Sequence, residues 1–243
     1  MINSPSNILE ICANGYNSAL AAELGGAHRV ELCDNLNEGG TTPSIGQLKL
    51  CLEKLSIPVV PIIRPRGGDF NYSTVELDIM IQDILAFKSI NCKGIVIGAL
   101  NNQNQIHKEY TKILIEAAGT MEVAFHRAFD RTPNLFKSLD ILIDLNIKRV
   151  LTSGGQKTAC EGISTIQKIV KQANQNIEIM PGSGINESNI LFLKEQSGAT
   201  NFHTTAKSIN SKPSTSIFTD LRDDYPLTDV NVVKQILEKL NPS

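Results

Sequence analysis

The chain has 243 residues, of which 41% are hydrophobic and 20% are charged, and its formal net charge is -2. These values are typical of a globular protein, and so small a net charge excludes a bulk field that attracts nucleic acid or an anionic membrane. The first residues lack a basic segment followed by an apolar core, and no apolar run approaches the roughly 20 residues that span a bilayer. We therefore expect a cytoplasmic protein without nucleic-acid or membrane partners.

Apolar runs with the length of β-strands recur along the chain at intervals of roughly 20–30 residues. The expected strands span residues 8–13, 28–33, 58–64, 94–99, 121–126, 148–153, 177–182 and 200–205. Expected helices lie at 15–25, 44–55, 73–90, 104–118, 133–146, 158–174 and 186–197. Eight strand–helix units predict an α/β fold, a (β/α)8 TIM barrel. A doubly wound open sheet is the alternative, but it usually stops at about five or six strands.

The last part of the chain has two contrasting segments. Residues 206–228 are polar and lack periodicity, so we expect them to be either functional or loosely held. Residues 229–240 form an amphipathic helix that we expect to cap or close the barrel. No internal boundary is visible, and we interpret residues 1–243 as a single barrel domain with a C-terminal helix.

Charged residues on the expected strands alternate with apolar ones. Successive strand side chains point to opposite faces, and the outer face of a barrel packs on helices, so the charged residues must point inward. This parity places inside the barrel Glu10, Glu31, Arg64, His126 and His203. All lie toward the carboxyl ends of their strands, where barrel enzymes have their active sites. We take Glu10, Glu31 and His126 as candidate acid–base groups; the alternative is a buried structural network in which arginine neutralises the two glutamates.

The loops that follow these strands are rich in arginine and glycine. They include IIRPRGGDF (62–70), FHRAFD (125–130) and PGSG (181–184). Barrels often bind phosphate with backbone N–H groups in the loops after the seventh and eighth strands. We therefore predict a site for an anionic small molecule. Its candidate residues are Arg64, Arg66, Arg127, Asp130, Gly182, Gly184 and His203. The alternative for the first loop is a solvated turn in which Arg66 and Asp69 form a surface pair.

The five cysteines are an odd number without a CxxC motif, which favours free thiols in a reducing cytosol. Cys12 and Cys33 have the same inward parity on sequential strands, which lie about 4.8 Å apart in a barrel. Two such thiolates could hold a soft ion, and Cu(I) is the common metal that they prefer. His203 could add a third ligand. The alternative is that both cysteines are small buried apolar residues.

Several segments together resemble the copper homeostasis protein CutC family. They are EICANGYNSALAAELGGAHRVELCDNLNEGGTTPS, IIRPRGGDF, FHRAFD, RVLTSGG and IMPGSGI, and the resemblance runs from about residue 8 to residue 208. It implies a cytoplasmic (β/α)8 barrel, often a homodimer or a larger homo-oligomer, linked to copper tolerance and Cu(I) binding. The copper-binding cysteines proposed for the family fall on Cys12 and Cys33.

The chain departs from the family pattern at two places. The GGG common after the seventh strand reads GSG, with Ser183 in the middle, and FHTTAKS stands where the family has serines and an arginine, although Lys207 keeps a basic residue there. The leading hypothesis is a Cu(I)-binding protein of copper homeostasis. The alternative is a barrel enzyme that acts on a phosphorylated or carboxylated metabolite, because Cu(I) alone does not explain arginines at the barrel mouth.

Overall fold

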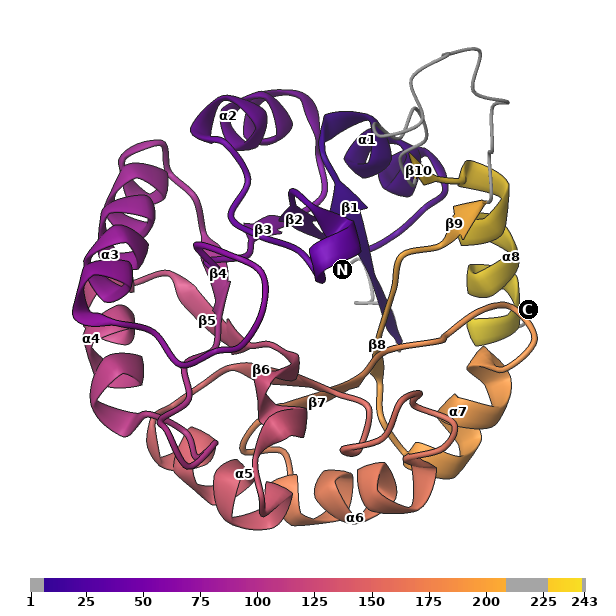
Figure 1. Cartoon of the computed structure of the whole chain (residues 1–243). Helices are drawn as coiled ribbons and strands as arrows, with labels where there is room; N and C mark the ends of the chain where they lie inside the picture. Colours follow the sequence, from indigo (N-terminus) through magenta and orange to yellow (C-terminus); the bar gives the residue numbers. More distant parts are fainter. Residues whose placement is uncertain (1–6, 209–226, 242–243) are drawn as a thin grey trace, which may run out of the picture.

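The computed structural model describes residues 7–208 and 227–241, and its centre is a closed ring of eight parallel strands (Figure 1). The strands are β1 Ile8–Asn14, β2 Arg29–Cys33, β3 Val59–Pro61, β4 Gly94–Ile97, β5 Glu122–Phe125, β6 Arg149–Thr152, β7 Glu178–Pro181 and β8 Asn201–Thr204. They pair in the orders β3-β2-β1-β8 and β4-β5-β6-β7. Parallel bridges from Ile62 to Val96 and from Gly182 to His203 join the two halves. The predicted (β/α)8 barrel is confirmed.

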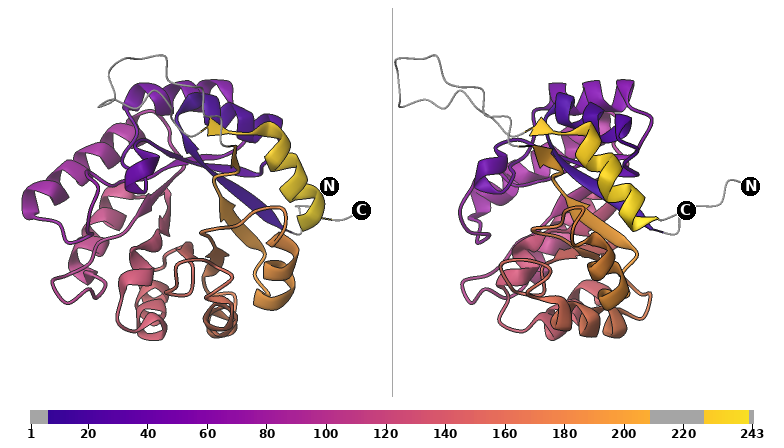
Figure 2. Two further views of the ribbon diagram at one scale, coloured as in Figure 1. Left: turned by 45° about the vertical axis from the view of Figure 1, so that its right-hand side comes forward. Right: turned by 90° about the vertical axis from the view of Figure 1, so that its right-hand side faces the viewer.

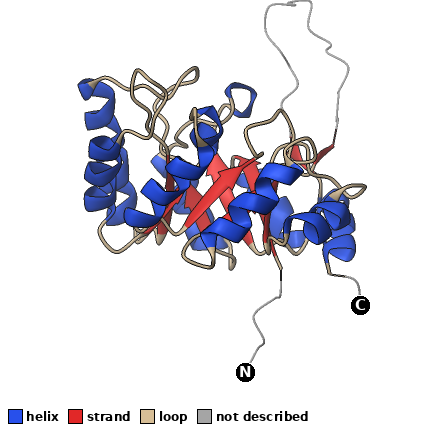
Figure 3. Ribbon diagram, turned by 90° about the horizontal axis from the view of Figure 1, so that it is seen from below, coloured by secondary structure: helices blue, strands red, loops and turns tan. Residues whose placement is uncertain are grey.

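Helices surround the strands on the outside (Figures 2 and 3). They are α1 Tyr16–Leu24, α2 Ile45–Lys54, α3 Thr74–Ser89, α4 Lys108–Ala118, α5 Leu135–Asp144, α6 Ile163–Ala173, α7 Ile190–Ser197 and α8 Val230–Leu240. Helix α8 packs between α7 and α1, so the C-terminal helix closes the outer ring. In the described ranges, no helix combines the length and apolarity that crossing a membrane requires.

Short elements follow the carboxyl ends of three of the strands. Two 3-10 turns, η1 (Leu36–Glu38) and η2 (Arg127–Arg131), follow β2 and β5. The antiparallel pair β9 (Lys207–Ser208) and β10 (Leu227–Thr228) follows β8. Most of the polar segment expected at 206–228 lies outside the described residues.

The alternation of the strands divides the core into two parts. Apolar side chains on the outer faces of the strands, such as Leu9, Ile11 and Phe125, are fully buried against the helices. A smaller apolar cluster fills the inside of the barrel and consists of Cys12, Cys33, Val60, Ile62, Val96 and Ala124. The polar side chains of the inner face therefore share their space with this cluster, and they must find partners or ligands there.

The third strand is shorter than the expected range 58–64. Its regular ladder ends at Pro61, and the backbone N–H of Arg64 donates to the side-chain oxygen of Thr42 at 2.9 Å instead of continuing the ladder. The chain thus leaves the strand while Arg64 still points inward, as the parity predicted, and its guanidinium is buried at the mouth of the barrel.

Candidate functional site

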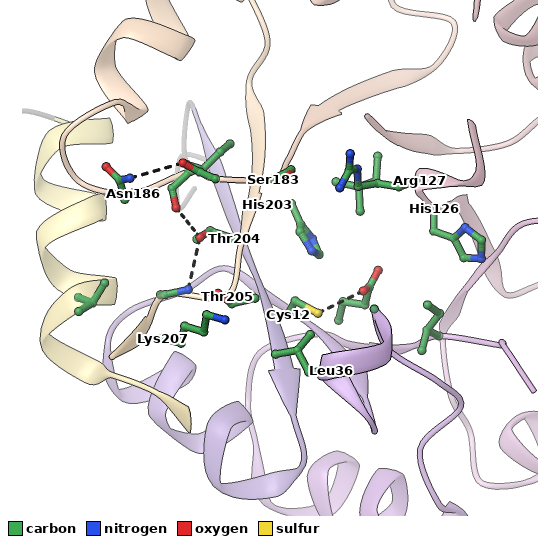
Figure 4. A pocket seen from close by; sticks show the side chains of 18 of the residues that line it. Cys12, Leu36, His126, Arg127, Ser183, Asn186, His203, Thr204, Thr205 and Lys207 are labelled. Carbon is green, nitrogen blue, oxygen red and sulfur yellow. Dashed lines mark hydrogen bonds between the residues drawn. The ribbon is translucent and has the colours of Figure 1, made fainter. Parts of the chain in front are cut away.

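A cavity of about 600 Å³ lies at the carboxyl ends of the strands. It is lined by these predicted site residues: Cys12, Glu31, Arg64, His126, Arg127, Gly184 and His203. Figure 4 shows several of them around the cavity, with Cys12 and His203 on one side and His126 on the other. Glu10 and Cys33 are buried without lining the cavity, and Arg66, Asp130 and Gly182 do not line it either.

Glu10 is the centre of a buried ionic network. It lies in register with Arg29 on β2 and with His203 on β8, and its carboxylate accepts from Arg29 Nε and pairs with His203 Nδ1, the latter at 2.8 Å. Burial alone would raise the pKa of Glu10, but Arg29 and His203 outweigh it and hold that pKa well below its ordinary value. Burial alone would lower the pKa of His203, and the Glu10 carboxylate raises it instead. Each group therefore favours the charged form of the other in this buried pair.

The arginine in this network is one that the sequence reasoning missed. Arg29 precedes Glu31 by two residues, so the parity that placed Glu31 inside applied to Arg29 as well. A second inward-facing arginine that the sequence reasoning missed is Arg149, at the start of β6. Its Nη2 donates to Glu122 Oε2 at 2.8 Å. Arg29 neutralises Glu10, whereas Arg64 forms no ion pair with either glutamate in the described ranges.

The thiols of Cys12 and Cys33 lie beside this network. Their sulfurs are 3.7 Å apart, Cys12 Sγ donates to Glu31 Oε1 at 3.5 Å, and Cys33 Sγ donates to the carbonyl of Ala13. Cys12, Glu31 and His203 each offer a ligand atom, and these atoms all lie within 4.8 Å of one another. The sequence paired Cys12 with Cys33 and His203; the tertiary structure adds Glu31, because residue 31 is the register partner of Cys12.

Two groups of this cluster, Cys12 and Glu31, have raised pKa values. The hydrogen bond to Cys33 and burial raise the pKa of the Cys12 thiol well above its ordinary value. Burial, together with the Glu10 carboxylate, raises the pKa of Glu31, and its Oε2 has no hydrogen-bond partner among the residues described. Cys12 is thus a neutral thiol at pH 7, and any metal that it binds must displace a proton.

Arg64 holds the rim of the cavity through backbone oxygens. Its Nη1 donates to the carbonyls of Glu38 and Gly40, both at 2.7 Å, and its Nη2 donates to that of Gly68 at 3.0 Å. It therefore ties the loop after β2 to the loop after β3. The side chain is only 4% exposed and pairs with no carboxylate in the described part of the chain, so it leaves a buried positive charge uncompensated.

His126 faces the cavity as a neutral hydrogen-bond donor. The backbone N–H of Ala128 donates to its Nδ1 at 3.1 Å, while its Nε2 has no partner among the described residues. Burial and the charge of Arg64 lower its pKa to about 3. The ring is therefore neutral at pH 7 with its proton on Nε2. Gly98 makes room for it, because a Cβ at that position would overlap the imidazole.

Asp130 organises a loop rather than lining the cavity. Its carboxylate accepts from Thr152 Oγ1 at 2.6 Å, from the backbone N–H groups of Ser153 and Gly155, and from Arg127 Nε at 2.8 Å. Arg127 in turn donates to Ser153 Oγ at 2.6 Å. These bonds fix the loop after β6 against η2, and they leave Arg127 at the edge of the cavity.

Arg66 lies on the outer surface of the loop after β3. It pairs with Glu76 on α3 and with Asp69 at 3.0 Å. This is the surface arrangement weighed as the alternative for the loop, with Glu76 as an additional partner. Arg64 and Arg66, which Pro65 separates, have the same parity but different surroundings, because the regular strand ends at Pro61 and the loop carries Arg66 to the surface.

The loop after β7 borders the cavity near β8. Ser183 and Gly184 both have positive φ angles, 82° and 72°, and Ser183 Oγ donates to the carbonyl of Lys157 at 2.8 Å. Thr204 Oγ1 donates to the carbonyl of Ile185 at 2.7 Å and ties this loop to β8 (Figure 4). A Cβ at Gly182 would come within 2.5 Å of Leu151 Cδ1, so a larger residue there would displace the Leu151 side chain.

The sequence is similar to proteins of one known family. The model of the CutC family matches residues 7–208. A family protein CutC from Xanthomonas campestris pv. campestris (strain 8004) is 43% identical over 235 residues, which cover 96% of this chain and 98% of that protein. The copper homeostasis protein cutC homolog of Homo sapiens is 44% identical over 201 residues, which cover 83% of this chain and 74% of that protein.

Solved structures agree with this assignment. The copper homeostasis protein CutC from Streptococcus agalactiae has a TM-score of 0.79 and 36% identity, covering 82% of this chain and 98% of its own. N-(5'-phosphoribosyl)anthranilate isomerase from Pyrococcus furiosus, at a TM-score of 0.58 and 13% identity over 96% of this chain and 98% of its own, shares the barrel fold alone. The match of the family model and the sequence identity to curated relatives together establish the family of this chain. The chain belongs to the CutC family.

Proposed function

We propose that this protein serves copper homeostasis by binding Cu(I) through Cys12 and Cys33, with His203 as a third ligand. The observation that carries the proposal is the pair of buried sulfurs 3.7 Å apart, together with a ring nitrogen of His203 that lies within 4.8 Å of the sulfur of Cys12. The human and S. agalactiae relatives are named for copper homeostasis, which supports the same role here.

The chemistry of the donors supports a soft metal. Thiolates and imidazole favour copper over hard cations, whereas Glu31 alone offers oxygen. His203 engages Glu10 through Nδ1, which leaves its Nε2 for a ligand and resembles the carboxylate–histidine pairs that orient ligands at metal sites. Because the pKa values of Cys12 and His203 are raised, Cu(I) binding must release protons, and the affinity should increase with pH.

The test is a Cu(I) titration against a competing chelator under reducing conditions. We expect one Cu(I) per chain for the wild type, weaker binding for Cys12→Ser or Cys33→Ser, and none for the double variant. Cys160→Ser is the matched control, because this partly exposed cysteine lies outside the cavity. Equal stoichiometry and affinity in the double variant and the wild type would contradict the proposal.

A second candidate function is an enzyme that acts on a phosphorylated or carboxylated metabolite. It is favoured by the size of the cavity, which at about 600 Å³ far exceeds the space of one ion, and by unpartnered atoms of Glu31 and His126 on its wall. The three catalytic candidates then divide their roles. Glu31 would exchange a proton, His126 would donate a hydrogen bond, and Glu10 would only position His203.

A metabolite screen by thermal shift tests this second function. We expect at least one anionic metabolite to stabilise the wild type and to fail to stabilise Glu31→Gln or His126→Asn. A screen in which no anion raises the melting temperature of the wild type would count against an enzyme.

We also propose that the protein is a cytoplasmic homodimer or larger homo-oligomer. The five cysteines are all free, which suits a reducing compartment. Analytical ultracentrifugation would test the assembly, and a sedimentation coefficient of a monomer at micromolar concentration would contradict it.

A further inference from the structure

We infer that the cavity wall formed by Arg64 after β3 and His126 after β5 is a subsite for the acidic group of a small carboxylate or phosphate ligand. His126 Nε2–H donates to an oxygen of that group, and Arg64 supplies the positive field. The inference deepens the second candidate function and names the part of the substrate that this wall recognises. It is separate from Cu(I) binding, whose proposed ligands lie on β1, β2 and β8.

His126 supplies a hydrogen bond that only a ligand or water can accept. The ring is 4% exposed, lines the cavity, and keeps Nδ1 occupied by the N–H of Ala128, so its proton must sit on Nε2. A buried donor without a protein partner is uncommon in folded proteins and is a reason to look for a ligand. Since Nε2–H can only donate, the ligand atom at this place is an acceptor.

The positive charge of Arg64 favours an acceptor that is negatively charged. Its guanidinium donates to three backbone carbonyls but pairs with no carboxylate in the ranges described, and it lies close enough to lower the pKa of His126. Phe70 contacts both groups, with its ring centroid 5.1 Å from Arg64 Cζ and 4.9 Å from the centroid of His126. A buried, uncompensated positive charge beside a neutral donor favours an anionic oxygen over a neutral one.

The rest of the cavity suits a small molecule that carries such a group. The volume of about 600 Å³ falls in the range of typical metabolite sites, roughly 300–1,000 Å³. Leu36, Ile62 and Leu151 supply apolar wall, and Glu31 Oε2 can accept a hydrogen bond from a ligand hydroxyl. The ligand therefore combines an acidic end at His126 with a polar, uncharged part that extends toward Glu31.

Nitrogen NMR of the histidine side chains can observe this contact directly. The chain has four histidines, so the His126 Nε2–H signal can be assigned by comparison with a His126→Asn spectrum. The probes are inorganic phosphate and glycerol 1-phosphate for the phosphate class, and pyruvate and succinate for the carboxylate class. We expect the His126 signal to show a neutral Nε2–H tautomer at pH 7 and to shift in a saturable way with at least one class. The class that shifts it identifies the acidic group.

A complementary pair of variants separates ligand contact from structural support. His126→Asn keeps an acceptor for Ala128 N–H but removes Nε2–H, whereas His126→Gln keeps a terminal N–H donor but loses that acceptor. We expect at least tenfold weaker probe binding by calorimetry for His126→Asn, since a hydrogen bond to an anion is lost, and near wild-type binding for His126→Gln. The matched control is His107→Asn, because His107 also accepts from a backbone N–H, that of Tyr110, but lies outside this cavity.

The outcomes distinguish this inference from the functions proposed above. Probe binding that depends on Nε2–H supports the subsite, whether or not the probe is turned over or copper binds. A His126 signal unchanged by all four probes at millimolar concentration overturns it, as does equal probe affinity of His126→Asn and the wild type. Loss of Cu(I) binding in the cysteine variants has no bearing on either result.

Discussion

Two parts of the barrel interior differ in how their buried charges are paired. On the β1–β2–β8 side, Glu10 meets Arg29 and His203, and every charge in this group has an opposite charge beside it. On the β3–β5 side, Arg64 donates to backbone carbonyls and pairs with no carboxylate among the residues described, and His126 is held neutral beside it. The ion pairs of Glu10 stabilise the fold by themselves, whereas we propose that an anionic ligand completes the surroundings of Arg64 and His126. The difference indicates where structure ends and recognition begins.

The largest effect should come from breaking the compensated side. Arg29→Met removes the main partner of the Glu10 carboxylate, which is 1% exposed, and should lower the free energy of unfolding by about 3–5 kcal/mol in urea denaturation. Adding Glu10→Gln removes the orphaned charge and should recover much of this loss. If Arg29→Met were as stable as the wild type, the ion pair between Arg29 and Glu10 would not contribute to the stability of the fold.

The pH dependence of stability sharpens the comparison on the other side. The unfolded chain protonates His126 near pH 6.5 and the folded protein only near pH 3, so the unfolded state binds one more proton in between. Stability should therefore fall as pH falls through this window, by about 1.4 kcal/mol per pH unit from this group. His126→Asn should remove that slope. Parallel curves for the two proteins between pH 6 and pH 4 would mean that His126 is not held neutral.

Gly98 offers a steric way to disturb the same wall. A methyl group at this position would overlap the His126 ring, so Gly98→Ala should cost about 1–3 kcal/mol of unfolding free energy and should shift the Nε2–H signal. Gly46→Ala is the matched control. This glycine lies in α2 with free space around its Cα, and alanine should stabilise the helix slightly. An unperturbed imidazole signal in Gly98→Ala would contradict the close packing.

The smallest effect is expected at Arg66, which the sequence placed in the anion site. Its side chain is 39% exposed and pairs with Glu76 and Asp69 on the surface. Arg66→Ala should therefore cost no more than about 1 kcal/mol by urea denaturation and should leave phosphate and pyruvate binding unchanged by calorimetry. A loss of probe binding would mean that Arg66 turns into the cavity when a ligand is present.

Sequence reasoning predicted more of the fold than of the site. Strand periodicity and spacing were sufficient for the barrel, because eight apolar runs separated by helical patterns leave few alternatives. They also placed Glu31, Arg64 and His126 on the inner face. They did not find Arg29, although the same parity applies to it, and they grouped Arg66 and Asp130 with the ligand residues. Nothing in FHRAFD shows that Asp130 accepts hydrogen bonds from the loop after β6.

What the sequence determined by itself was the face of the barrel on which each side chain lies, because alternation along a strand is a local property of the backbone. Which groups meet there was decided only by the tertiary structure. The register between neighbouring strands pairs Glu10 with Arg29 and His203, and Cys12 with Glu31. Register depends on how the whole barrel closes, so residues nearly 200 positions apart become partners that no local pattern could name.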